Sequence, residues 1–152
     1  MALEDDIAFF EQVPTLAALG TPALRVLAIG AESRKLTGGA VLFYAGELAD
    51  GGYIVQDGSL VVETSGTVEV REYTVGPGTL LGELALFIDT VSPVTVIARE
   101  PTVLIRISRS AFRKMLESYP DAAARLRDMM ASRLGSLTQD LTDVQRKLNV
   151  SE

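Results

Sequence analysis

Two reactive side chains are missing from this 152-residue sequence, which contains no cysteine and no histidine. Without cysteine the chain cannot form disulfides, zinc–thiolate sites or a thiol nucleophile. Without histidine it has no imidazole base, and any metal site would need oxygen ligands alone. These absences exclude zinc fingers and thiol or histidine catalysis. We therefore expect a protein that is not an enzyme and holds no metal.

Long hydrophobic runs and an excess of positive charge are missing as well. The apolar stretches are too short and too often interrupted by polar residues to cross a bilayer. The start of the chain, residues 1–6, is acidic where a secretion signal would be basic. The net charge is −6, with six basic and fourteen acidic residues in 1–108 and eight basic and six acidic residues in 109–152. Because no basic stripe is present, we expect a cytoplasmic protein with no nucleic-acid partner and no membrane segment.

The pattern of apolar residues divides the chain into three parts that form one domain, 1–152. Hydrophobic residues make up 47% of the sequence, enough for a sizeable core. Helical spacing dominates 1–32, short β-rich runs separated by glycines fill 33–108, and helical spacing returns in 109–152. The sequence therefore predicts an α+β fold: an antiparallel β jelly-roll barrel flanked by N-terminal and C-terminal helices.

Within the predicted barrel, the turn signals are specific enough to place individual strands. Asp57-Gly58 is typical of a tight turn and separates the runs 53–56 and 59–62. Two further β-rich runs, 94–98 and 102–107, flank the short connection 99–101.

The C-terminal part predicts a short helix capped by Ser110 and then a long helix that starts near Pro120. The later helix has apolar residues at alternating gaps of four and three, which is a heptad pattern. These seam residues are Met130, Leu134, Leu137, Leu141, Val144 and Leu148. A helix of this kind needs a partner surface, so we expect a homodimer through the Met130–Leu148 helix. The alternative is that the seam packs against the protein's own barrel.

The sharpest motif is Gly82-Glu83-Leu84-Ala85-Leu86, which follows a strand-rich region and opens a short apolar turn. Unpaired backbone amides at the start of such a turn attract anions. A glycine lets a ligand approach the backbone closely, and a carboxylate accepts hydrogen bonds from hydroxyls. Taken alone, Gly-Glu-Leu is common and also fits an ordinary turn that begins with an acid.

This segment resembles the phosphate-binding cassette of the cyclic nucleotide-binding domain family. Further parts of the family pattern follow in the expected order: Gly39-x-x-Leu42-Phe43-x-x-Gly46, Tyr53-Ile54-Val55-x-x-Gly58, Gly78-x-x-x-Gly82 and Phe112. The resemblance implies that the ligand is cyclic AMP or cyclic GMP. It also implies that Glu83 accepts a hydrogen bond from the ribose, that Gly82 permits close approach, and that the amides of Leu84 and Ala85 face the cyclic phosphate.

One position departs from the family pattern, because Ser92 stands where the family usually has an arginine. No lysine or arginine occurs anywhere from 72 to 98, and Pro93 removes a backbone donor beside the site. A missing charge-assisted hydrogen bond is worth about 1.5–3 kcal/mol, or roughly 10- to 150-fold in affinity. Amides of the turn and the Ser92 hydroxyl could offset part of this loss.

A cation from another strand is the remaining way to hold the anion. The candidates are Arg34, Lys35 and Arg71, although the strand periodicity directs Arg71 toward solvent.

These observations favour a stand-alone regulatory module that binds a cyclic nucleotide, with affinity weakened at Ser92, and that signals to an unknown effector protein. Its expected ligand-binding residues are Gly82, Glu83, Leu84, Ala85, Ser92 and Pro93. One alternative is a degenerate domain that no longer binds nucleotide and acts in dimerisation or protein interaction. Another is a cupin-type enzyme on the same kind of barrel, which the lack of histidine opposes.

Overall fold

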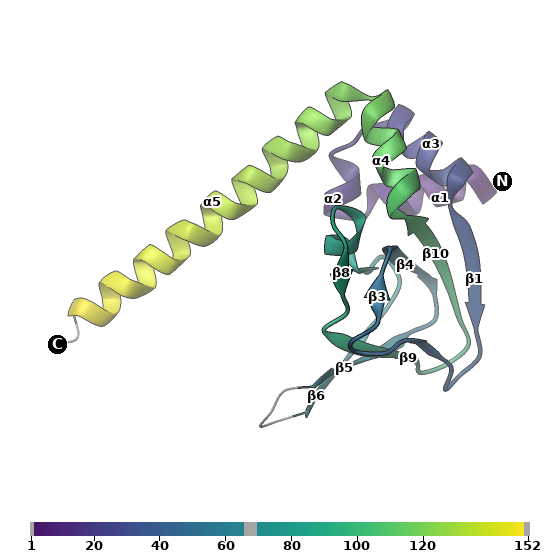
Figure 1. The fold of residues 1–152 in the computed structure, drawn as a ribbon, viewed down its shortest axis with the longest axis horizontal. Helices are drawn as coiled ribbons and strands as arrows, with labels where there is room; N and C mark the ends of the chain where they lie inside the picture. The colour runs from purple at the N-terminus through teal and green to yellow at the C-terminus, as the bar shows by residue number, and fades with distance from the viewer. Residues whose placement is uncertain (1, 66–69, 151–152) are drawn as a thin grey trace.

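The computed structural model describes residues 2–65 and 70–150 of the chain, and the side chains of 3–64 and 71–135. Helices gather at one end of a β-barrel, and a single long helix extends away from this body toward the C-terminus (Figure 1). This arrangement confirms the predicted α+β class with a barrel between two helical parts.

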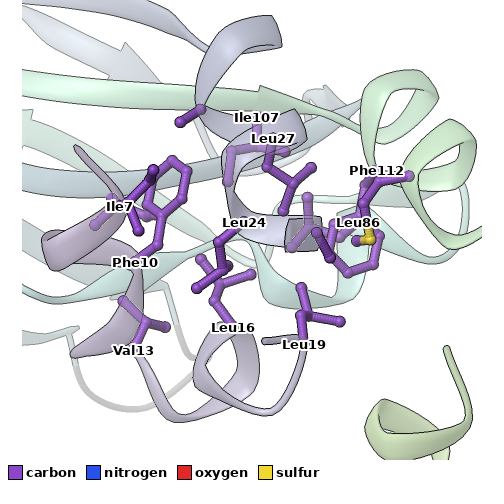
Figure 2. Close-up of a cluster of buried hydrophobic side chains, with 14 of the residues drawn as sticks. Ile7, Phe10, Val13, Leu16, Leu19, Leu24, Leu27, Leu86, Ile107 and Phe112 are labelled. Atoms are coloured by element: carbon purple, nitrogen blue, oxygen red, sulfur yellow. The ribbon is translucent and has the colours of Figure 1, made fainter. Parts of the chain in front are cut away.

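Three short helices precede the barrel and supply most of the helical core. They are α1 (Ala2–Glu11), α2 (Pro14–Ala17) and α3 (Thr21–Gly30). Many of their apolar residues are fully or almost fully buried, among them Phe10, Leu16 and Leu24. Figure 2 shows these side chains gathered in one cluster, with Leu86 and Phe112 beside them. The helices therefore bury their apolar faces against the end of the barrel that carries Leu86.

The barrel consists of two four-stranded antiparallel sheets and a small two-stranded one. The first sheet has the order β1 (Glu32–Leu36), β10 (Thr102–Ser108), β4 (Gly51–Asp57), β7 (Leu80–Leu81). The second has the order β2 (Val41–Phe43), β9 (Val94–Ala98), β5 (Leu60–Ser65), β6 (Val70–Val75). The third pairs β3 (Leu48–Ala49) with β8 (Thr90–Val91).

The predicted tight turn at Asp57-Gly58 is present, and it joins the two large sheets. Strand β4 pairs with β10 and β7, whereas β5 pairs with β6 and β9. Gly58 has a φ of +92°, and a Cβ there would lie 2.5 Å from the carbonyl oxygen of Pro101. The turn packs against the β9–β10 connection, a contact that the local sequence does not encode.

Side chains on the two faces of β10 belong to two different hydrophobic clusters. Ile105 and Ile107 face the helical cluster, while Leu104 faces a second cluster inside the barrel. Because side chains of a strand point alternately to its two faces, this sheet has one helix-covered face and one interior face. The interior face is where the cavity described below is found.

After the barrel come α4 (Arg109–Ser118) and α5 (Pro120–Val150). The cap of α4 is Ser108, whose Oγ accepts a 3.1 Å hydrogen bond from the amide of Ala111, so the expected cap at Ser110 is wrong. In α5, Met130 packs against the helical core, whereas Leu134 is 65% exposed. The other predicted seam residues, from Leu137 to Leu148, have side chains outside the described residues.

Candidate functional site

A cavity of about 480 Å³ opens between the inner faces of the barrel strands and the short 3-10 helix η1 (Glu83–Leu86). All six predicted site residues line it, although they come from two segments on different walls. The cassette residues Gly82 to Ala85 follow β7, while Ser92 and Pro93 lie between β8 and β9. The fold thus brings the two predicted segments to one site.

Gly82 turns the chain from β7 into η1 by a left-handed conformation, with a φ of +76°. A Cβ at this position would lie 2.9 Å from the carbonyl oxygen of Gly51. Both observations require glycine, because side chains rarely tolerate positive φ and because the cassette passes close to β4.

Glu83 is held by a cation from the long C-terminal helix. Its Oε1 accepts a 2.7 Å hydrogen bond from Nη1 of Arg133, and the two side chains are 33% and 49% exposed. Nη2 of the same arginine donates to Oγ1 of Thr15 at 3.3 Å, and Thr15 is buried in α2. No pattern in the sequence relates positions 83 and 133, so this partner was not predicted.

The amides of η1 differ in their availability to a ligand. The Ala85 amide donates to the carbonyl of Gly82 at 3.0 Å, so it is already engaged. Within the part of the chain that the structure describes, the amides of Glu83 and Leu84 have no hydrogen-bond partner. Leu84 is also 56% exposed, whereas Ala85 is buried. Of the two amides expected to face a phosphate, only that of Leu84 is open.

The Ser92 hydroxyl, which we expected to help bind an anion, forms hydrogen bonds within its own segment of the chain. Its side chain is buried, with Oγ donating to the Val94 carbonyl at 2.7 Å and accepting from the Val94 amide at 3.3 Å. Its backbone is also paired, with the carbonyl of Glu47 and the amide of Gly46. The hydroxyl therefore closes a turn around the exposed Pro93, and its proton is already engaged.

Four charged residues line the cavity, and two of the acids are already paired. The four charged residues are Arg34, Glu47, Asp50 and Glu83. Asp50 accepts a 2.8 Å hydrogen bond from Nη2 of Arg106, a side chain that is only 13% exposed. Burial alone would lower the pKa of Arg106, but hydrogen bonds to Asp50 and Tyr53 raise it above its ordinary value. Arg106 thus stays charged and cancels the charge of Asp50.

Arg34 lies at the solvent-exposed rim of the cavity, over the aromatic ring of Tyr53. Its Cζ atom is 5.8 Å from the ring centroid, a distance typical of a cation–π contact. Tyr53 also lines the cavity and lies 6.0 Å from the ring of Phe43.

Arg109, the first residue of α4, ties η1 to the barrel. Its Nη1 donates to the carbonyl oxygens of Ile88 at 2.7 Å and of Ala49 and Ala85 at 3.4 Å, while Nη2 pairs with Asp89. Nearby, the rings of Phe87 and Phe112 pack edge to face at 5.4 Å. The cassette is therefore joined to α4 by both polar and apolar contacts.

Neither a metal-binding cluster nor a membrane-spanning helix is present among the described residues. No group of three or more acidic side chains among them could hold a metal ion. No helix there is long and apolar enough to span a membrane.

Comparison with known proteins agrees with the geometry of the site. The family model described as "Cyclic nucleotide-binding domain" matches residues 33–119. A cyclic nucleotide-gated potassium channel of Mesorhizobium japonicum is 30% identical over 124 residues, which cover 82% of this chain and 34% of the channel. A cAMP-dependent protein kinase regulatory subunit of Yarrowia lipolytica is 33% identical over 98 residues, 64% of this chain and 25% of the subunit.

This chain is also similar to a solved structure. The cyclic nucleotide-binding-like protein of Brucella abortus is 38% identical and has a TM-score of 0.67, with 74% of this chain and 98% of that one covered. This chain therefore matches nearly the whole of one small relative, but only about a third and a quarter of the channel and the kinase subunit.

Proposed function

The chain belongs to the cyclic nucleotide-binding domain family, and on that premise we propose that it is a regulatory module that binds cyclic AMP or cyclic GMP beside Glu83. The observation that carries this proposal is the position of Glu83 and the open Leu84 amide on the wall of one cavity. A carboxylate can accept a hydrogen bond from a ribose hydroxyl, and an open amide can donate to a phosphate oxygen.

We expect the affinity to be modest. The position of the usual arginine is taken by Ser92, and its hydroxyl is engaged by Val94. The loss of one charge-assisted hydrogen bond lowers affinity by roughly 10- to 150-fold. We therefore expect the affinity to be lower by about this factor than with an arginine at position 92.

The ion pair between Glu83 and Arg133 connects the proposed ligand site to α5. A ribose hydroxyl that donates to Glu83 shares this carboxylate with Arg133 of α5. A ligand shifts an equilibrium only through contacts that differ between two states, and this shared carboxylate is such a contact. We propose that occupancy of the cavity changes the position of α5, and that an effector protein responds to α5.

A homodimer through α5 completes this proposal. Leu134 belongs to the heptad seam and is largely exposed, and α5 extends away from the body beyond it (Figure 1). A helix with an apolar seam is stabilised when a second helix covers that seam.

Calorimetry with cyclic AMP and cyclic GMP at millimolar concentration tests the binding site. We expect saturable binding by the wild type and an affinity about tenfold or more lower for Glu83→Gln, because the amide is a weaker acceptor than the carboxylate. Glu47→Gln is the matched control, since Glu47 lines the same cavity on another wall. If neither nucleotide gives heat or a thermal shift with the wild type, the proposed function is wrong.

A second candidate function is protein interaction by a domain that no longer binds nucleotide. It is favoured by exposed apolar side chains close to the cassette, namely Leu48, Leu84, Ile88 and Val91. Leu48 and Val91 face each other across the β3–β8 pair. This candidate predicts no nucleotide response in the same calorimetry.

A further inference from the structure

The anion-binding end of the cavity needs a cation that the usual position does not supply. We infer that Arg34 on β1 replaces the missing arginine and binds the anionic group of the ligand; this inference rests on the proposed function. Three observations support it: the charges of the cavity wall, the place of Arg34 in the sheet, and the lack of a comparable alternative.

Arg34 is the basic residue among the charged residues that line the cavity. Asp50 is neutralised by Arg106 and Glu83 by Arg133, and Glu47, which is exposed, is the third acid of the wall. No acid among the described side chains pairs with Arg34, and its recorded contact is the ring of Tyr53. Removing an anion from water is costly unless a cation or a set of donors compensates it. An unpaired guanidinium at the rim is therefore the group best suited to that compensation.

Strand pairing places Arg34 on the inner face of the sheet. Arg34 lies opposite Leu104 of β10, and Leu104 belongs to the core inside the barrel. Two strands further on, Tyr53 of β4 lies opposite Leu81 of β7, which immediately precedes Gly82. The guanidinium over the Tyr53 ring thus lines the same cavity as the start of the cassette.

The other two candidates from the sequence do not line the cavity. Lys35 is the next residue of β1 and lies opposite Val103, on the other face of the strand, where it is exposed. Arg71 on β6 is also exposed and is absent from the cavity wall. Lys35 therefore serves as a matched control, because it carries the same charge one residue away.

Arginine suits this task because its planar guanidinium can present two parallel donors to a phosphate while it stacks on an aromatic ring. The ligand class that follows is a nucleoside with a singly charged phosphodiester. The neutral nucleoside should gain nothing from Arg34, so Arg34 should determine the preference for the cyclic nucleotide over its nucleoside.

The test compares cyclic AMP with adenosine, which has the same base and ribose but no charge. Wild type, Arg34→Gln, Arg34→Lys and Lys35→Gln are each titrated with both ligands by calorimetry at low and high salt. We expect Arg34→Gln to lower the affinity for cyclic AMP about tenfold and to leave that for adenosine unchanged. Arg34→Lys should restore part of the loss, and Lys35→Gln should behave as wild type. Added salt should weaken cyclic AMP binding more in the wild type than in Arg34→Gln.

The outcomes separate this inference from the proposed function. If the wild type binds no cyclic nucleotide, the proposed function fails and the inference fails with it. If the wild type binds cyclic AMP and Arg34→Gln binds it equally well, only the inference is overturned. An equal loss of cyclic AMP and adenosine binding in Arg34→Gln, with a lowered melting temperature, would indicate a structural role and would also overturn it.

Discussion

Ser92 illustrates how one residue can keep a site's shape while changing its chemistry. Its backbone bonds to Glu47 and Gly46 hold the wall of the cavity in place, and its hydroxyl completes the turn at Val94. The sequence suggested that this hydroxyl could help to bind an anion. The structure instead assigns it an internal partner, because a short turn around Pro93 brings the Val94 carbonyl to 2.7 Å.

Ser92→Ala tests this assignment. We expect the free energy of unfolding to fall by about 1 kcal/mol, because the amide and carbonyl of Val94 lose their partner. The affinity for cyclic AMP should stay unchanged. Urea unfolding and calorimetry measure the two quantities, and a clear loss of affinity with unchanged stability would show that the hydroxyl serves the ligand instead.

At the scale of elements, η1 depends on α4 for its position. A four-residue 3-10 helix has little stability of its own, since it makes few internal hydrogen bonds. Arg109 donates to the carbonyl of Ala85 within η1 and to that of Ile88 just after it, and Phe87 packs against Phe112. The cassette is therefore held in position by contacts with the start of α4.

Arg109→Gln should weaken this connection. We expect a loss of about 2 kcal/mol in the free energy of unfolding, since several hydrogen bonds from a charged donor disappear at once. Affinity for cyclic AMP should fall as well, because the Leu84 amide is less firmly placed. Arg113→Gln, an exposed position on the same helix, is the control. Equal stability of the two variants in urea unfolding would contradict the positioning role.

At the scale of the whole molecule, α5 links the ligand site to the proposed dimer. Its first half packs on the helical core through Met130 and reaches Glu83 through Arg133. Its continuation leaves the body as a single helix (Figure 1). One element thus contacts Glu83 of the cavity wall and carries the heptad seam that the sequence predicts.

The dimer is tested by sedimentation equilibrium. We expect the wild type to be a dimer and Leu141→Glu to dissociate it, raising the dissociation constant roughly 100-fold or more, because the seam would then bury an unpaired charge. Gln145→Glu adds the same charge to the same helix outside the seam and should leave the dimer intact. A monomeric wild type, or a dimeric Leu141→Glu, would refute the proposal.

The sequence by itself determined what depends on neighbours along the chain. Helical spacing, glycine punctuation and period-two runs located the helical parts, the strands 94–98 and 102–107, and the barrel between them, all of which the structure confirms. The cassette motif also identified the segment that lines the cavity. These features are local, because turn chemistry and side-chain periodicity act within a few residues.

Only the tertiary structure decided which side chains meet. Glu83 and Arg133 are 50 positions apart, and Asp50 and Arg106 are 56 apart. Nor does the sequence of β1, Glu-Ser-Arg-Lys-Leu, show an apolar alternation that would tell which face Arg34 takes. That face follows from the register with β10, and a slip of one residue would exchange Arg34 for Lys35. Register is set by pairing across the whole barrel. The sequence could therefore supply the candidate cations, but only the fold shows that Arg34 is the one that lines the cavity.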